Sequence, residues 1–317
     1  MADGVGAGAA GGAGFEFGVN VGRAASRAGF ADVVRRAGEA GFDVIAAPDH
    51  LGCLSPFVSL ATAASLDPRL RLRTYVLDAG FWNAALLARD VATLDVLSGG
   101  RVELGVGAGH VRDEHEDAGV RWGPLAERVR WMEDLLVEVR RRLADEAHSP
   151  RPVQRPVPLV VGAMSRAGLA VAARHADVVA FPGALQVRGE RPGTLRLATA
   201  EEVAERVAHV REAAAGRPHR CDVLLQLVAL DPDPERVAAE LVAGDPHTSA
   251  ADALASPACL FATDAADGAA QLRRRSAEFG FTAFSTHDWN LDALGRVVAE
   301  LRRPPGPAGP VAAQRVG

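Results

Sequence analysis

Apolar runs and amphipathic stretches alternate along nearly the whole chain. Short apolar or alternating runs are typical of strands, and stretches with an apolar residue every three to four positions are typical of helices. The pattern predicts strands at Phe15–Val19, Asp43–Ala47, Leu70–Leu77, Val102–Val106, Leu159–Val161, Val178–Phe181, Val223–Val228 and Thr282–Ser285. It predicts helices at Phe30–Ala40, Pro56–Ser65, Ala84–Leu97, Leu125–Leu143, Ala167–His175, Glu201–Ala214, within Glu235–Phe279, and at Leu291–Leu301.

This succession of strand-helix units predicts an α/β fold, specifically a (β/α)8 TIM barrel. An open doubly wound sheet is the alternative, because periodicity does not show whether a sheet closes. We expect one domain over residues 15–302, with insertions after the sixth strand, at Gly183–Leu197, and after the seventh. Residues 1–14, rich in Ala and Gly, and the Pro/Gly-rich end at 303–317 are predicted to be a disordered leader and tail.

The segment from Leu87 to Gly109 carries the most specific local pattern. Helical spacing predicts one apolar face made of Leu87, Val91, Leu94 and Leu97. The turn Ser98-Gly99-Gly100 ends this helix, because glycine accepts the left-handed backbone found after a helix. A strand over 102–106 follows, and three glycines at its end allow the backbone to approach a ligand closely, namely Gly105, Gly107 and Gly109.

Composition narrows the classes of function. The net charge of −5 and the pI near 6.0 argue against nucleic acid or an anionic membrane as a partner. The chain contains no Lys, which excludes Schiff-base and lysine-nucleophile chemistry, and its Arg, Ala and Gly usage is typical of a GC-rich, actinobacterial-type genome. Its three widely spaced cysteines argue against a disulfide framework or a zinc ribbon and favour a cytoplasmic location. No apolar stretch is long enough and sufficiently free of charge to span a membrane.

The segment 87–109 closely resembles the luciferase-like flavin and deazaflavin oxidoreductases, the luciferase-like monooxygenase superfamily. Within that superfamily it is most similar to the F420-dependent branch. The resemblance runs from Phe15 to about Leu301 and is weakest in the insertions. It implies a luciferase-like TIM barrel that holds coenzyme F420, or alternatively FMN, at the carboxyl ends of its strands.

The second predicted strand ends in Asp49-His50, which matches an Asp-His pair of the family. The resemblance implies that His50 lies beside the deazaflavin ring and acts as an acid or base. Histidine suits this role because it titrates near neutral pH, and Asp49 would orient or charge it. The alternative is a loop histidine that caps local backbone.

The third strand and the residues after it supply further cofactor candidates. The resemblance implies a non-proline cis peptide between Tyr75 and Val76, forming a bulge against the cofactor ring, and a polar contact from Asn83. Tyr75 and Trp82 are otherwise core or pocket-wall aromatics.

Gly107, Ala108, Gly109 and His110 form the loop after the fourth strand. The resemblance places this loop at the cofactor or substrate. Sugar-phosphate-oxidising members carry Glu where this chain has His110, so the departure argues against glucose 6-phosphate as the substrate. The charged run 112–117 matches no metal-binding spacing, so we predict no metal and interpret the run as a solvated face.

The loop after the fifth strand contains Gly162, Ala163, Met164 and Ser165. Backbone amides at the start of the following helix can hold a phosphate with help from the helix dipole. The resemblance implies that this loop binds the F420 phosphate, with Ser165 and Arg166 as further donors. An ordinary helix N-cap by Ser165 is compatible with that role, because both share one geometry.

These features predict an F420-dependent oxidoreductase that transfers a hydride between F420 and an organic substrate of unknown identity. One alternative is an FMN-dependent two-component monooxygenase, and another is a catalytically silent flavin- or F420-binding protein. The predicted partners are a small-molecule substrate, a reductase that supplies reduced cofactor, and, from the resemblance alone, a second copy of the chain.

Overall fold

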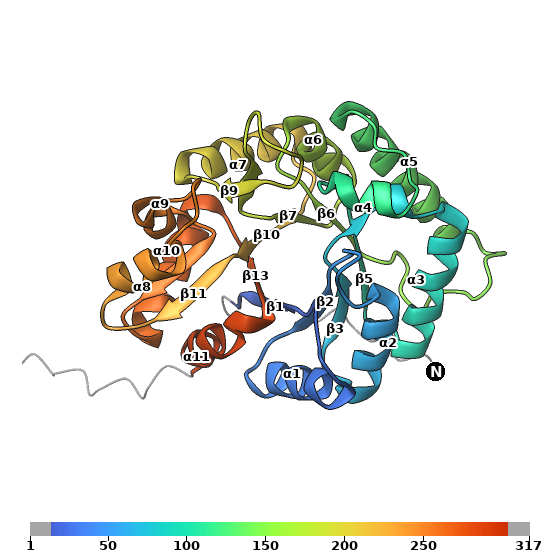
Figure 1. Cartoon of the computed structure of the whole chain (residues 1–317). Coiled ribbons are helices and arrows are strands. Elements are labelled where there is room, and N and C mark those ends of the chain that lie inside the picture. Colours follow the sequence, from blue (N-terminus) through green and yellow to red (C-terminus); the bar gives the residue numbers. More distant parts are fainter. Residues whose placement is uncertain (1–13, 304–317) are drawn as a thin grey trace, which may run out of the picture.

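The computed structural model describes residues 14–303, which form a closed parallel barrel inside a ring of helices (Figure 1). The strands follow the order β3-β2-β1-β13-β10-β7-β6-β5-β4, and a pairing between β3 and β5 closes the sheet. Their bounds are β1 Glu16–Asn20, β2 Val44–Ala47, β3 Arg71–Thr74, β4 Leu77–Asp78, β5 Val102–Gly107, β6 Leu159–Gly162, β7 Val178–Phe181, β10 Arg220–Leu225 and β13 Ala283–His287. β3 and β4 both pair with β5 and together make one strand of the barrel. The nine strands therefore fill eight positions, and the predicted (β/α)8 barrel is confirmed.

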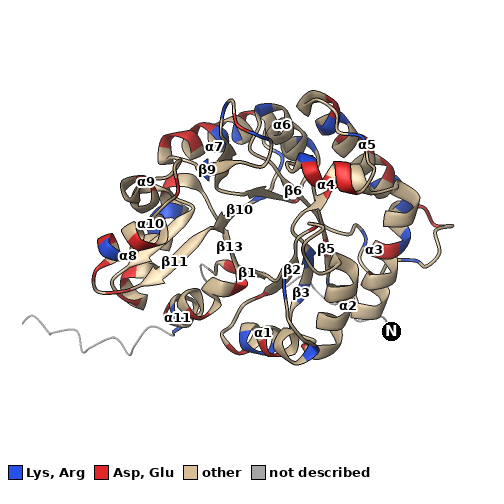
Figure 2. Cartoon of the chain, viewed as in Figure 1, with Lys and Arg blue, Asp and Glu red and all other residues tan. Residues whose placement is uncertain are grey.

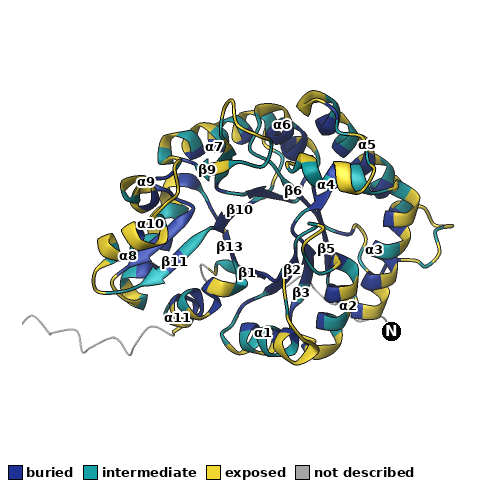
Figure 3. Ribbon diagram, viewed as in Figure 1, coloured by how far each residue is buried: buried dark blue, intermediate teal, exposed yellow. Residues whose placement is uncertain are grey.

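Helices cover the outside of the barrel and bury one apolar face each (Figure 3). They are α1 Arg27–Glu39, α2 Pro56–Leu66, α3 Ala84–Ser98, α5 Leu125–Ala144, α6 Arg166–His175, α7 Ala200–Ala214, α10 Ala265–Phe279 and α11 Leu291–Leu301. In α11 the residues Leu291, Leu294 and Val298 are buried, as the helical period requires. Charges of both signs lie mostly on the outward faces of these helices (Figure 2).

Helix α3 corrects one detail of the predicted apolar face. Leu87, Val91 and Leu94 are buried, but Leu97 is 73% exposed and Ser98 is buried in its place. At 100° per residue, position 97 lies about 80° away from position 87 around the helix, whereas position 98 returns to the same side. Gly99 ends the helix with a φ of 70°, as predicted.

Both insertions are present, and the second departs from the prediction. After β7 an antiparallel hairpin pairs β8 Ala184–Gln186 with β9 Leu195–Leu197; we call residues 184–197 the roof hairpin. After β10 the chain forms β11 Leu227–Leu230, α8 Pro234–Leu241, α9 Ala250–Ala255 and β12 Cys259–Ala262. The seventh predicted strand therefore covers parts of both β10 and β11. Strand β12 was missed and lies in the region predicted as helical, because a short apolar run does not distinguish a strand from a helix.

The predicted leader and tail fall outside the described residues, apart from positions 14 and 303. Within the described part of the chain, none of the helices is both long and apolar enough to cross a membrane.

Ion pairs fill the barrel interior near the amino ends of its strands. The buried guanidinium of Arg73 donates to Glu16 at 2.5 Å, to Glu103 at 2.6 Å and to Asp222 at 2.9 Å. Arg71 and Arg220 add contacts to the same carboxylates, so three arginines face three acids. Burial alone would raise the pKa of Glu103, but the facing arginines outweigh it and hold that pKa below its ordinary value.

Replacing Glu103 with Gln should lower the free energy of unfolding by about 3 kcal/mol or more, because Arg73 would remain buried beside one fewer carboxylate. Urea unfolding at neutral pH measures this loss. Since folding depresses the pKa of Glu103, its contribution is present above about pH 4.5 and declines as the pH falls below that value.

The matched control is Glu39→Gln, which breaks an exposed ion pair with Arg35 and should leave the free energy of unfolding nearly unchanged. Equal effects of the two substitutions would contradict a structural role for the interior ion pairs.

Candidate active site

A cavity of about 1430 Å³ opens at the carboxyl ends of the barrel strands, where barrel enzymes place their active sites. Gly105, Asn83 and Arg166 do not line it. The other predicted site residues do, namely Asp49, His50, Tyr75, Val76, Gly107, Ala108, Gly109, His110, Gly162, Ala163, Met164 and Ser165. The roof hairpin closes one side of it, so the cavity lies between the strand ends and this insertion. The strand-end rule therefore selected residues that the structure brings together around one cavity.

Asn83 has a different place. Its side-chain oxygen accepts hydrogen bonds from the amides of Ala85 and Leu86 and so caps the exposed start of α3. It does not line the cavity, and we leave it out of the proposed cofactor site.

His50 is oriented by Glu114 and not by Asp49. Both carboxylate oxygens of Glu114, on the short helix α4 (Arg112–Asp117), lie 3.0 Å from Nδ1 of His50. A carboxylate accepts only, so Nδ1 carries a hydrogen, and in the neutral form of the ring Nε2 has the lone pair. The side chain of His50 remains 35% exposed, which leaves it accessible from the cavity.

Asp49 has other partners, which corrects the expectation that it orients His50. One of its oxygens accepts from the Trp82 indole at 2.7 Å and from the amide of Asp78 at 3.2 Å. Burial raises the pKa of Asp49, and these two hydrogen bonds partly oppose that shift. Asp49 therefore joins the loop after β2 to the end of β4 and to the segment that follows it.

His110 stands beside His50, with the two rings edge to face and their centroids 5.2 Å apart. Loss of hydration among the surrounding groups is the larger cause, and the positive charge that His50 can carry is the next. Together they lower the pKa of His110 to about 4. His110 is thus a neutral imidazole at pH 7. The cavity offers it as a hydrogen-bonding group without a charge.

The loop before His110 is held by the buried side chain of Arg128. Arg128 of α5 donates to the carbonyls of Ala108 and Gly109 and stacks on Trp122, 3.7 Å from the ring centre. Gly109 has a φ of 72°, and a Cβ there would overlap the carboxylate of Asp78. Only glycine fits at this close approach.

Helix α4 overturns the interpretation of residues 112–117 as a solvated face. Glu114 reaches His50, and the fully buried His115 donates from Nε2 to Asp78 at 2.9 Å. Arg112, Glu116 and Asp117 keep the expected exposure. Nothing in the local charge pattern separates the inward residues from the outward ones, because the partners come from other strands.

The peptide bond between Tyr75 and Val76 is cis, as the resemblance implied. Val76 projects into the cavity wall between three glycines of the neighbouring strands. A Cβ on Gly107 would come within 2.8 Å of the Val76 side chain, one on Gly162 within 3.1 Å, and one on Gly105 within 3.2 Å. The glycines of β5 and β6 therefore make room for the Val76 side chain. We call the apolar part of the cavity wall formed by Val76, Gly107 and Gly162 the Val76 platform.

The loop after β6 has the geometry of an anion site. Ser165 caps α6 by accepting from the amide of Gly168 at 3.1 Å. Arg206 of α7 lines the cavity and donates to the carbonyl of Met164 at 3.0 Å, and its nearest carboxylate, on Glu205, lies 3.9 Å away. Arg166, the expected donor, is exposed, pairs with Glu205 and does not line the cavity.

Further lining residues follow β10 and β13 and were missed from the sequence. Nε2 of His287 lies 3.1 Å from the side-chain oxygen of Gln226, and Trp289 stacks on His287 at 4.2 Å. Burial lowers the pKa of His287 to about 4. The signal was available, because His287 lies just beyond the eighth predicted strand, as His50 lies just beyond the second.

Comparisons with known proteins agree with this architecture. A family model described as luciferase-like monooxygenase matches residues 12–294. An uncharacterised Mycobacterium tuberculosis protein, Rv0953c, is 32% identical over 232 residues, covering 65% of this chain and 74% of that protein. An FMNH2-dependent dimethylsulfone monooxygenase of Pseudomonas putida is 31% identical over 113 residues, 31% of each chain. The solved structure of an F420-dependent secondary alcohol dehydrogenase with an F420-acetone adduct superposes with a TM-score of 0.74 at 15% identity, covering 92% of this chain and all of the other.

The electrostatics of the cavity give a direct prediction for His110. An NMR titration of the histidine side chains, with His110 assigned through a His110→Gln variant, should show this ring neutral at pH 6 and protonated only near pH 4. Titration of His110 at the ordinary value near 6.5 would contradict this lowering of its pKa.

Proposed function

The chain belongs to the luciferase-like monooxygenase family, and from that premise we propose that it is an F420-dependent oxidoreductase acting on a small organic molecule. One observation carries the proposal: the hydrogen-bonded pair of Glu114 and His50 lies in the same cavity as the Val76 platform. Oxidation of an alcohol, or reduction of a carbonyl, moves a proton as well as a hydride, and this pair can exchange the proton.

The cavity fits a planar ring with an anionic tail. The Val76 platform offers an apolar surface, because Val76 fills the space that side chains on Gly107 and Gly162 would take. At another part of the wall, the amides at the start of α6, the Ser165 hydroxyl and Arg206 suit a phosphate. Bound F420 would supply the hydride chemistry, and the protein would supply position and electrostatics.

His50 is the proposed proton acceptor and donor. Glu114 fixes its tautomer, so that the basic Nε2 is the nitrogen left for the substrate oxygen. The carboxylate also stabilises the imidazolium that forms when Nε2 takes a proton. Neighbouring His110 adds a neutral hydrogen-bonding group at 5.2 Å from His50, and Asp49 holds the loop that carries His50.

The experiment that tests the cofactor is an equilibrium titration of the purified protein with F420, reduced F420, FMN and FMNH2, followed by absorbance or fluorescence. We expect preferential binding of F420 or its reduced form. Preference for FMN or FMNH2 would instead support a flavin-dependent monooxygenase, and oxygen uptake would be measured next. Binding of none of the four would defeat the proposal.

Substitutions at the proton-transfer pair should separate chemistry from binding. His50→Ala should reduce kcat by about 10² to 10⁴-fold while leaving the F420 dissociation constant nearly unchanged. Glu114→Gln should cost less than Glu114→Ala, because an amide oxygen still accepts from Nδ1 but carries no charge.

Glu116→Gln is the matched control for this series, because Glu116 lies on the same helix and pairs outward with Arg112. A loss of F420 affinity in His50→Ala, with unchanged turnover per bound cofactor, would remove the proton-transfer role.

Crowding the Val76 platform should weaken cofactor binding. Gly162→Val places methyl groups against Val76, whose side chain is already 3.1 Å from an added Cβ, so the F420 dissociation constant should rise at least tenfold. Gly29→Val on the exposed face of α1 is the control, since a Cβ there meets only Ser26 at an ordinary 3.5 Å. Equal F420 affinity in both variants would remove the platform from the cofactor site.

A further inference from the structure

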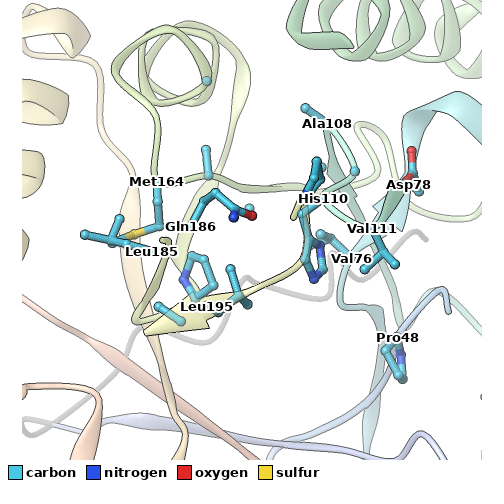
Figure 4. Close-up of a pocket in the computed structure, with 18 of the residues that line it drawn as sticks. Pro48, Val76, Asp78, Ala108, His110, Val111, Met164, Leu185, Gln186 and Leu195 are labelled. Atoms are coloured by element: carbon cyan, nitrogen blue, oxygen red, sulfur yellow. The ribbon is translucent and has the colours of Figure 1, made fainter. Parts of the chain in front are cut away.

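One wall of the cavity is not used by the proposed cofactor site. The Val76 platform lies at β4, β5 and β6, and Figure 4 shows Val76 across the cavity from Leu185 and Leu195 of the roof hairpin. The unused wall is formed where the neighbouring strands β1, β13 and β10 end (Figure 1). We call it the β13 wall, and it consists of Asn20, Gln226, His287 and Trp289.

His287 presents a hydrogen-bond acceptor to the cavity. The amide nitrogen of Gln226 donates to the carbonyl of Pro182 at 2.7 Å, so its oxygen is the atom that faces Nε2 of His287 at 3.1 Å. An amide oxygen only accepts, and Nε2 therefore carries the hydrogen. Burial lowers the pKa of His287 to about 4, so the ring is neutral at pH 7 and Nδ1 has the lone pair. Within residues 14–303 no group hydrogen-bonds to Nδ1, and this atom is not buried.

Asn20 lies between His287 and the Val76 platform. It is the partner of His287 in the parallel pairing of β1 with β13, and its amide nitrogen lies 3.5 Å from the carbonyl of Tyr75, the residue before Val76. Asn20 is 5% exposed, and its side-chain oxygen has no donor among the described residues, which is costly for a buried amide. One long contact leaves the amide free to turn, so a donor on a ligand in the cavity would satisfy this oxygen.

Trp289 gives the β13 wall a large aromatic surface. It lines the cavity, is 70% exposed, and stacks on His287 with the ring centres 4.2 Å apart and the planes inclined by 10°. Aromatic rings in a cavity wall favour planar aromatic partners, which stack on them or meet them edge to face. A ligand that covers the indole would also remove its apolar surface from water.

The turn that carries His287 and Trp289 is fixed by a buried side chain. Asn290, at the end of the short helix η2 (Asp288–Asn290), donates to the carbonyl of Gln226 at 3.1 Å. It also donates to the hydroxyl of Thr286 at 3.0 Å and accepts from the amide of Val228 at 3.2 Å. A surface that is already ordered loses less entropy when a ligand binds. The β13 wall is therefore built as a binding surface.

Charged residues of both signs also reach this part of the cavity. Arg23 lies on the loop after β1, and Asp288 lies between the two rings of the β13 wall in the sequence. The wall therefore selects a ligand by shape and by hydrogen bonding rather than by net charge.

We propose that the β13 wall binds the substrate, and that the substrate is a planar aromatic molecule with a hydroxyl or N–H donor. Its ring packs against Trp289, and its donor meets Nδ1 of His287 or the amide oxygen of Asn20. This inference rests on the proposed function, because Asn20 places the wall beside a cofactor ring bound on the Val76 platform. His287 is thus a residue that determines specificity.

The test compares three probes with the same two-ring frame. 2-Naphthol is planar and carries a donor, 2-methoxynaphthalene is planar without a donor, and decahydro-2-naphthol carries the donor without the planar ring. The F420 dissociation constant is measured first, and binding of each probe to the F420-loaded protein is then measured by calorimetry. We expect 2-naphthol to bind more tightly than either of the other probes, by about threefold or more.

Substitutions in the wall separate the two contacts. His287→Phe removes the acceptor and should weaken 2-naphthol binding by about three- to tenfold, with little change for 2-methoxynaphthalene. His287→Asn keeps an acceptor close to the position of Nδ1 and should lose less. Trp289→Leu removes the aromatic surface and should weaken the binding of both planar probes.

The matched controls are the same replacements outside the cavity. His219→Phe lies in the loop at the opposite end of β10, and Trp131→Leu lies on α5. Both should leave the three probe affinities unchanged. The F420 dissociation constant should be nearly the same in all five variants.

The possible results separate the two claims. A protein that binds no F420 fails the proposed function at the first step, and the inference fails with it. A protein that binds F420 but binds the three probes equally, or binds none of them, overturns the substrate class alone. Unchanged probe affinities in His287→Phe and Trp289→Leu would remove the wall from the substrate site. A loss of F420 affinity in both variants would assign the wall to the cofactor and overturn the inference as well.

Discussion

The closed barrel depends on the ion pairs that Arg73 makes with three carboxylates in its interior. Glu16, Glu103 and Asp222 come from β1, β5 and β10, so one side chain of β3 joins four strands. An eight-stranded barrel is wide enough to be filled by side chains, and here charged ones fill its amino end. Those charges are stable there because their numbers balance. The carboxyl end is then left open for a cavity.

In the cavity at the carboxyl ends of the strands, several ionisable groups are paired with one another, and Nε2 of His50 is left available. Asp49 is bound by Trp82, and Asp78 by His115. Glu114 accepts from Nδ1 of His50, so in the neutral ring Nε2 has the lone pair. Under the proposed function, this nitrogen is the position that exchanges a proton with the substrate.

Much of the fold and the centre of the site could be predicted from the sequence because they depend on local patterns. Strand and helix periods gave the barrel order, and the rule that sites follow strands selected Asp49-His50 and both glycine loops. The partner of His50 could not be found this way, since Glu114 lies 64 residues further along the chain. Arg206 reaches the cavity from the middle of α7, and periodicity contains no information about such a contact. His287, at the end of β13, was missed although the strand-end rule also applied to it. Asn83 is the opposite case: the resemblance implied a cofactor contact, but its side chain caps the start of α3 and does not line the cavity.

The most direct measurement is a crystal structure of the protein with F420. The account predicts the phosphate at the start of α6, within hydrogen-bond distance of Ser165 or Arg206, and the ring on the Val76 platform with His50 beside it. A phosphate bound elsewhere, or a ring that leaves the platform uncovered and lies away from His50, would contradict the assignment of this cavity as a deazaflavin site.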